Sequence, residues 1–298
     1  VDLNFLQPVD GPIGRCFTLI SDCGERTFAI SKGAMDKLTP EYIDKEVVQG
    51  SSALVLTAYL MRASEGDGIT DAAMTAINYA KEADVPVVLT LGTRFLIQED
   101  PQWWQNFISE HVTILAMNED EGEALTGFKD PLLASEMALD WCDMVLTTAG
   151  AIGLYTAGYT EDAEKRETSH TLLPGAIPEF NRYEFSRPKL QVDCDTPIKV
   201  YAHIAPYMGG PELIRNTNGA GDGALSALLH DLSANTFHKT NVPGSSKHKR
   251  DGLCYSSFSQ VCKYANRVAY EVLAQHSPRL SRGLPEREDS LEESYWER

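Results

Sequence analysis

A glycine-rich stretch in the last third of the chain has the residue types that bind an anion. Residues 216–223 read NTNGAGDG, and good helix formers at apolar spacing follow directly over residues 224–231. The first N–H groups of a helix lack internal partners and carry the positive end of the helix dipole, so they attract an anion. Gly219 and Gly221 allow the backbone to approach that anion closely. The stretch therefore predicts an anion-binding loop that opens a helix.

Asp222, which follows these glycines, has two interpretations. As an N-cap, its carboxylate would accept a hydrogen bond from one of the first helical N–H groups. As a general base, it would take a proton from a hydroxyl group held beside the anion. The eight residues by themselves do not decide between the two, because short glycine-rich matches are weak evidence.

Two earlier stretches have a structural and a functional interpretation each. Residues 148–153 read TAGAIG between two predicted strands, which is typical of a hairpin turn or of a turn whose backbone lies against a phosphorylated ligand. Residues 118–121 read NEDE and join a predicted strand to a helix. This pattern indicates either a helix cap or a carboxylate that holds Mg²⁺ through water, since Mg²⁺ keeps most of its water ligands.

The elements that must position these stretches form a repeating α/β pattern. Apolar strand-like runs alternate with helical segments, and the runs cover residues 53–57, 85–91, 112–116 and 144–147. Such repeats predict a parallel sheet with helices on both faces. Ligands of these sheets bind beyond the carboxyl ends of the strands, where residues 118–121 and 148–153 fall.

Other segments interrupt this pattern. Residues 14–30 are expected to form two strands joined by an Asp/Gly turn. Residues 160–198 and 232–252 are polar and are interpreted as insertions, while residues 258–274 predict a long helix.

Composition limits the class of partner and the compartment. The chain of 298 residues has a net charge of −17, and because a nucleic-acid-binding surface is usually basic, we expect no nucleic-acid partner. Its six cysteines are scattered without a C-x-x-C motif, so we expect free thiols and a cytoplasmic protein. No apolar run approaches the roughly 18 residues that a membrane helix needs, so no membrane association is expected.

Together, the three stretches resemble the ribokinase-type (PfkB) family of carbohydrate and nucleoside kinases. The order Asn-x-x-Glu, Thr-x-Gly-x-x-Gly and then NTNGAGDG matches the magnesium, nucleotide and phosphate-loop segments of that family. The resemblance extends over essentially the whole chain, and is closest to its purine-nucleoside kinases, through residues 10–20, 172–177, 203–211 and 277–280 (DGPIGRCFTLI, LLPGAI, HIAPYMGGP and SPRL).

This resemblance implies a fold and a reaction. The fold is a three-layer α/β/α sandwich with a mostly parallel central sheet and a small β lid, formed by residues 14–30, within one kinase domain over residues 1–298. The reaction is ATP-dependent phosphorylation of the 5′-hydroxyl of inosine and guanosine in purine salvage. The alternatives are a sugar kinase of the same family and a catalytically silent nucleotide-binding fragment.

The resemblance also implies residue roles. Asp222 would be the base for the 5′-hydroxyl, and the N–H groups of Gly219, Ala220 and Gly221 would form the anion hole. Glu121 would organise Mg²⁺, and Arg62 would face the acceptor. The residues expected to border ATP are Asn118, Thr148, Ala149, Gly150, Ala151, Ile152, Gly153, Asn218 and Asn266.

Two departures from the family pattern qualify these roles. Asn216 occupies a position where the family usually has the Asp that helps to bind a monovalent cation, so potassium dependence is left open. The family's N-terminal portion, with opening strands and an acceptor-binding Gly-Gly segment, is absent, so we expect an N-terminally truncated chain that is weakly active or inactive alone. The pattern does not determine the oligomeric state.

Overall fold

Alternating strands and helices occupy most of the chain, as the apolar runs predict. The computed structural model describes residues 7–20, 26–61, 68–172, 174–245 and 251–286. These residues fall into two units, residues 1–86 and residues 87–298, which are described separately. Whether the two units make up one kinase domain stays a prediction. Arg62, the candidate acceptor residue, lies outside the described residues.

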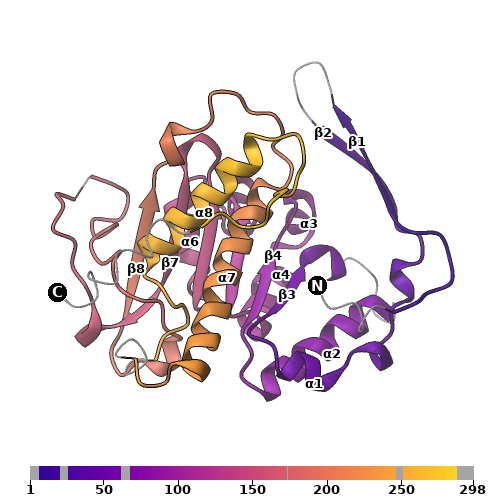
Figure 1. The fold of residues 1–298 in the computed structure, drawn as a ribbon, viewed down its shortest axis with the longest axis horizontal. Coiled ribbons are helices and arrows are strands. Elements are labelled where there is room, and N and C mark those ends of the chain that lie inside the picture. Colours follow the sequence, from indigo (N-terminus) through magenta and orange to yellow (C-terminus); the bar gives the residue numbers. More distant parts are fainter. Residues whose placement is uncertain (1–6, 21–25, 62–67, 173, 246–250, 287–298) are drawn as a thin grey trace. The chain divides into compact units, whose positions relative to one another are not determined.

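The first unit contains the predicted hairpin. Strands β1 (Arg15–Ile20) and β2 (Arg26–Ser31) pair antiparallel with Phe17 opposite Ala29, and they form a long two-stranded ribbon (Figure 1). The hairpin prediction is therefore confirmed. The remaining elements of this unit are η1 (Met35–Lys37), η2 (Pro40–Tyr42), α1 (Lys45–Gln49), β3 (Leu54–Thr57), η3 (Ala58–Met61) and α2 (Gly68–Glu82).

The second unit is built on a sheet with the strand order β4-β5-β6-β7-β8. Its strands are β4 (Val87–Thr90), β5 (Ile114–Asn118), β6 (Met144–Thr148), β7 (Leu154–Glu161) and β8 (Pro197–Ile204). Strands β4, β5 and β6 are parallel, whereas β7 and β8 each run antiparallel to the preceding strand. The parallel strands are almost fully buried because helices cover both faces, which explains their unbroken apolar sequences.

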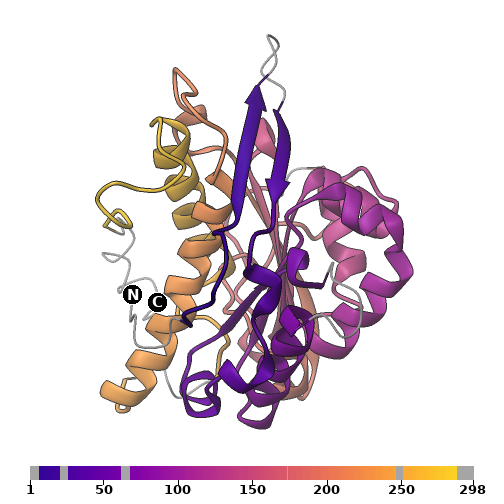
Figure 2. The same cartoon turned by 90° about the vertical axis from the view of Figure 1, so that its right-hand side faces the viewer.

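Helices lie on both faces of this sheet and complete the predicted three layers in the second unit (Figure 2). One face carries α3 (Arg94–Glu99), α4 (Pro101–His111), α5 (Glu119–Thr126) and α6 (Pro131–Ala138). The other carries α7 (Ala220–Asn241) and α8 (Phe258–Leu273), which pack side by side. No helix in the described ranges is long and apolar enough to cross a membrane.

Helix α7 corrects one sequence prediction. The polar excursion expected from residue 232 begins only after Asn241, where the helix ends. Polar residues of the helix are buried and bonded: Asn235 Nδ2 donates to the Gly252 carbonyl at 2.7 Å, and Asp231 Oδ2 accepts from the Ser256 N–H at 2.9 Å. The polar residues made this stretch resemble a loop in the sequence. In the structure, Asp231 and Asn235 form hydrogen bonds with the main chain of the segment before α8 and do not face water.

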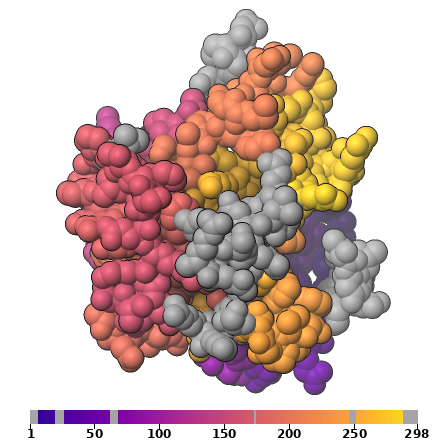
Figure 3. Space-filling view, turned by 60° about the vertical axis from the view of Figure 1, so that its left-hand side comes forward, coloured from indigo at the N-terminus to yellow at the C-terminus, as the bar shows by residue number. Residues whose placement is uncertain are grey.

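The segment between β7 and β8, which the sequence predicts to be an insertion, has little regular structure. Among the described residues 162–172 and 174–196, the helices are the short η5 (Asp162–Glu164) and η6 (Gln191–Asp193), and these residues form much of the pink and coral surface in Figure 3. Arg187 of this segment donates to the Cys254 carbonyl at 2.6 Å and to Asn235 Oδ1 at 3.1 Å. The insertion is thereby anchored to α7 and to the segment before α8.

A substitution at Gly158 of β7 tests the packing of α8 on the sheet. A Cβ at Gly158 would lie 2.7 Å from Cε1 of the fully buried Phe258, so we expect Gly158→Ala to lower the free energy of unfolding by about 1–3 kcal/mol. Chemical denaturation measures the change. Gly244→Ala is the matched control, because its Cβ would meet nothing within 4 Å. Equal effects of the two substitutions would contradict this packing.

Candidate active site

Two of the sequence-predicted stretches meet at the carboxyl ends of the parallel strands. Asn118 ends β5 and Thr148 ends β6, and the two residues are direct neighbours in the strand register. Just beyond them, a Cβ placed on Gly150 would lie 3.4 Å from Glu119 Oε1. The start of α5 and the turn between β6 and β7 therefore lie against each other.

The start of α5 is a capping box, which confirms the structural interpretation of residues 118–121. Asn118 Oδ1 accepts from the Glu121 N–H at 2.8 Å, and Glu121 Oε2 accepts from the Asn118 N–H at 2.9 Å. These reciprocal bonds hold the Glu121 carboxylate in one orientation at the edge of the sheet. The functional interpretation is compatible with this cap, because Glu121 has a second carboxylate oxygen.

Glu121 is an unusually buried carboxylate, with 4% of its surface exposed. Burial raises its pKa to about 7, and the negative charges of Asp120, Glu119 and Asp222 add smaller increases that the Asn118 N–H opposes. The contribution of Asp222 places the candidate base within electrostatic reach of Glu121. The structure thus brings the two predicted carboxylates together.

The start of α7 has no side-chain cap among the described residues. Gly219, in the left-handed conformation with φ +82°, is the N-cap, and Asp222 is the third helical residue, exposed to solvent. The capping interpretation of Asp222 is therefore wrong. A Cβ on Gly221 would meet nothing within 4 Å, so the space above this helix start is open. An uncapped and open helix start can bind an anion.

The segment after α8 holds this loop in place, which the sequence analysis missed. Asn216 Nδ2 donates to the His276 carbonyl at 2.9 Å, while Asn216 Oδ1 accepts from the Asn218 N–H at 2.9 Å. Gly219 packs so closely that a Cβ there would lie 2.0 Å from the Pro278 carbonyl oxygen. The only signal in the sequence was the resemblance of residues 277–280 to the kinase family.

The turn after β6 is the hairpin turn that the glycines predicted, since β6 and β7 are antiparallel neighbours. The Ala149 N–H donates to the Gly153 carbonyl at 2.9 Å, and the Ile152 N–H donates to the Ala149 carbonyl at 2.8 Å. Gly153 has φ +114°, and a Cβ there would lie 2.2 Å from the Ile204 carbonyl oxygen. The short helix η4 (Gly150–Ile152) remains exposed, so its backbone can face a ligand.

Asn266 contributes to the same edge from α8. Its side chain is 7% exposed, and its Nδ2 donates to the carbonyls of Ile204 and Ala205 at 3.0 and 2.9 Å. Because Gly153 packs on the Ile204 carbonyl, Asn266 supports the turn through the end of β8. Its predicted contact with a nucleotide stays a prediction.

These groups define what the site can do chemically. An open helix start supplies N–H donors for an anion, and an exposed carboxylate beside it can accept a proton from a hydroxyl group. No cluster of three or more His, Cys, Asp or Glu side chains suited to a metal occurs in the described part of the chain. The buried carboxylate of Glu121 fits a metal such as Mg²⁺, which is held mainly by water and phosphate oxygens.

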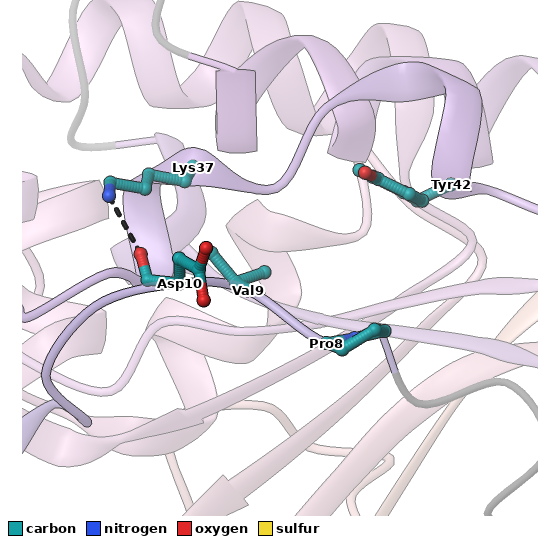
Figure 4. Close-up of a pocket in the computed structure, with 5 residues that line it drawn as sticks. All are labelled: Pro8, Val9, Asp10, Lys37 and Tyr42. Carbon is teal, nitrogen blue, oxygen red and sulfur yellow. Dashed lines mark hydrogen bonds between the residues drawn. The ribbon is translucent and has the colours of Figure 1, made fainter.

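A separate pocket of about 640 Å³ lies in the first unit. Its lining residues are Pro8, Val9, Asp10, Lys37 and Tyr42 (Figure 4). Lys37 Nζ donates to the Asp10 carbonyl at 2.8 Å, so its charge is directed at the main chain. None of the sequence-predicted site residues lines this pocket, and it is not the candidate active site.

Comparison with known proteins identifies the class to which this fold and site belong. The sequence profile of the pfkB family carbohydrate kinases matches residues 1–171. The chain belongs to this family, whose kinases use ATP and a divalent metal ion.

Three individual proteins resemble this chain in sequence or in fold. The chain is 69% identical over 297 residues to the guanosine-inosine kinase of Escherichia coli K12, and it spans 68% of that enzyme's length. The adenosine kinase of Sinorhizobium meliloti has a similar fold, with a TM-score of 0.60 and 19% identity over 91% of this chain and 63% of that one. A Burkholderia thailandensis nucleoside kinase in complex with inosine has a TM-score of 0.55 and 13% identity over 97% of this chain and 70% of that one. Both structures confirm the ribokinase-like fold.

Glu121 makes stability depend on pH. Its pKa rises from 4.5 in the ordinary carboxyl group to about 7 in the folded protein, so the folded state binds more protons than the unfolded state between these values. The free energy of unfolding therefore falls as pH rises from about 4.5 to 7, by about 3 kcal/mol at most, and stays at this lower level, with no further change from this group, above pH 7.

We expect Glu121→Gln to remove this fall. The measurement is chemical denaturation at several pH values in metal-free buffer, comparing each variant with the wild type. Glu99→Gln, at an exposed carboxylate, is the control and should shift stability equally at all pH values. A difference between Glu121→Gln and wild type that stays constant across this range would contradict the raised pKa.

Proposed function

We propose that this protein catalyses the ATP-dependent phosphorylation of the 5′-hydroxyl group of purine nucleosides, with inosine and guanosine as acceptors. The observation that carries this proposal is the open, uncapped start of α7 with the exposed Asp222 in its first turn, within electrostatic reach of Glu121. Membership of the kinase family and the 69% identity to a guanosine-inosine kinase support the choice of acceptor.

The main chain at the start of α7 stabilises charge. Phosphoryl transfer depends on positioning and on neutralising the phosphoryl oxygens, with little covalent chemistry left to the protein. The N–H groups of Gly219, Ala220 and Gly221 donate to these oxygens, and their orientation is fixed in advance by the contact of Gly219 with Pro278. Donors that are already oriented need no rearrangement as negative charge develops.

Asp222 completes the reaction by accepting the proton of the nucleoside 5′-hydroxyl group. Its exposed carboxylate does not cap the helix, so it can face an acceptor placed above the open helix start. The exposed turn of residues 148–153 and the side chain of Asn218 border the nucleotide in this proposal. Glu121 and Asn118 would hold Mg²⁺ through water, and the ion would screen the phosphate charges.

The proposal includes a cytoplasmic location and small-molecule partners only. The five cysteines in the described part of the chain are free thiols, which supports a reducing compartment. The net charge of −17 supports the absence of a nucleic-acid partner, since such a surface is usually basic. The role of a monovalent cation at Asn216 remains open within this proposal.

Transfer of labelled phosphate from ATP tests the function and the base together. The assay uses a chain that also has the N-terminal portion whose absence is expected to weaken activity, and there we expect product with inosine and guanosine, and little with adenosine or ribose. Asp222→Asn should lower turnover by about 10²- to 10⁴-fold and leave ATP affinity near the wild-type value, because only the proton acceptor is lost. Glu212→Gln, which removes an exposed carboxylate that has no role in the proposal, is the control. Turnover by Asp222→Asn at the wild-type rate would rule out this base, and ribose as the best acceptor would favour a sugar kinase.

A substitution at Gly221 can distinguish an effect on catalysis from an effect on the stability of the fold. Gly221→Ala should maintain or raise the free energy of unfolding, by up to about 1 kcal/mol, because alanine favours the helix and its Cβ meets no atom within 4 Å. The same methyl group occupies the space proposed for the phosphoryl group, so turnover should fall by about 10²-fold.

Gly219→Ala is the matched comparison. Its Cβ would overlap the Pro278 carbonyl at a φ of +82°, so we expect losses of both stability and turnover. Thermal unfolding and initial rates measure the two properties. Full turnover by Gly221→Ala would show that the open space is not where the phosphoryl group binds.

A further inference from the structure

His203 makes a side-chain contact with the turn that follows β6. Its Nε2 lies 2.9 Å from the carbonyl oxygen of Ile152, in the exposed part of that turn. Because a carbonyl oxygen only accepts hydrogen bonds, the imidazole donates through Nε2. The turn is therefore bonded to β8 by a side chain as well as packed on it through Gly153.

The ring of His203 is held in the orientation that this bond needs. Tyr155 of β7 is the direct neighbour of His203 in the strand register. The two ring centroids are 4.4 Å apart, with 31° between the ring planes. This tilted ring contact restricts the plane of the imidazole, so less side-chain freedom is lost when Nε2 bonds to the turn.

The main chain of His203 is fixed from the other side by the insertion. Asn181 Oδ1 accepts from the His203 N–H at 2.6 Å, and Asn181 Nδ2 donates to the His203 carbonyl at 3.2 Å. The Asn181 N–H also donates to the Tyr201 carbonyl at 2.8 Å. Since β8 is the last strand of the sheet, Asn181 satisfies its outer edge as a further strand would.

The turn itself leaves room for rearrangement without His203. Gly150 has φ +47°, and the main-chain bonds that close the turn join Ala149 to Gly153 and Ile152 to Ala149. Glycine permits several backbone conformations, so these bonds alone do not fix the direction of each exposed N–H and carbonyl group. The bond from His203 removes this freedom at the exposed end of the turn.

We propose that His203 is a positioning residue for ATP, which acts by fixing the backbone of residues 150–152, with Asn181 as its support. This inference rests on the proposed function, which places that turn along ATP. It predicts a selective effect on ATP affinity, because a different set of contacts, from His276 and Pro278, holds the start of α7 where the phosphoryl group and Asp222 meet.

The test compares His203→Leu, which removes the donor and retains bulk, with His203→Gln, whose amide can donate to the same carbonyl. We expect His203→Leu to raise the KM for ATP by about 3- to 10-fold, the value of one neutral hydrogen bond, and to leave kcat and the KM for inosine within about twofold. His203→Gln should restore most of the loss. His170→Leu, an exposed histidine of the insertion, is the control and should leave all three constants unchanged.

Several results would overturn the inference and leave the proposed function intact. One is an unchanged KM for ATP in His203→Leu. Another is an equal loss in kcat and in both KM values, with a lower melting temperature in both variants, because that pattern indicates general damage to the fold. If the wild type does not phosphorylate inosine, the inference is tested by calorimetric titration with ATP, which measures the ATP affinity of the wild type and of His203→Leu. Binding about 3- to 10-fold weaker in His203→Leu supports the inference, equal binding overturns it, and no binding by the wild type overturns both proposals.

Discussion

The contact between Gly219 and the Pro278 carbonyl is the constraint on which the candidate site depends. It allows the chain to enter α7 through a left-handed glycine, and no described side chain then caps the helix. The positive end of a helix dipole with its N–H groups uncovered is costly for stability and useful for binding phosphate. Asn216 secures the same loop through the His276 carbonyl and the Asn218 N–H. The contacts that His276 and Pro278 make with this loop therefore stabilise an uncapped helix start.

A second constraint is electrostatic. Glu121 is buried at the end of the sheet, near the negative charges of Asp120, Glu119 and Asp222, and its pKa is raised to about 7. The capping box with Asn118 keeps this carboxylate in place despite the cost of burial. In the proposed function, a cation that arrives with the nucleotide would relieve this repulsion, so the burial and the like charges at Glu121 would favour binding of a metal-nucleotide complex.

A third feature is the way the end of β8 joins several parts of the second unit. The Ile204 carbonyl packs against Gly153 and accepts from Asn266, while His203 bonds to Ile152 and is itself held by Asn181. The insertion, α8 and the turn after β6 thus act on one short piece of strand. An exposed turn of small residues is therefore held by these neighbours as well as by its own main-chain bonds.

Much of this protein could be predicted from local sequence. The apolar runs predicted the parallel strands, the Asn118-to-Glu121 pattern predicted a capping box, and residues 216–223 predicted the start of a helix, because each depends on neighbours within a few residues. The extent of α7 was predicted wrongly, since burial of Asp231 and Asn235 against a distant segment decides it. Only the tertiary structure determined that Asp222 does not cap its helix, that Pro278 packs against the glycine before α7, and that His203 reaches Ile152. Those outcomes depend on contacts between residues about 50 or more positions apart, which no local pattern encodes.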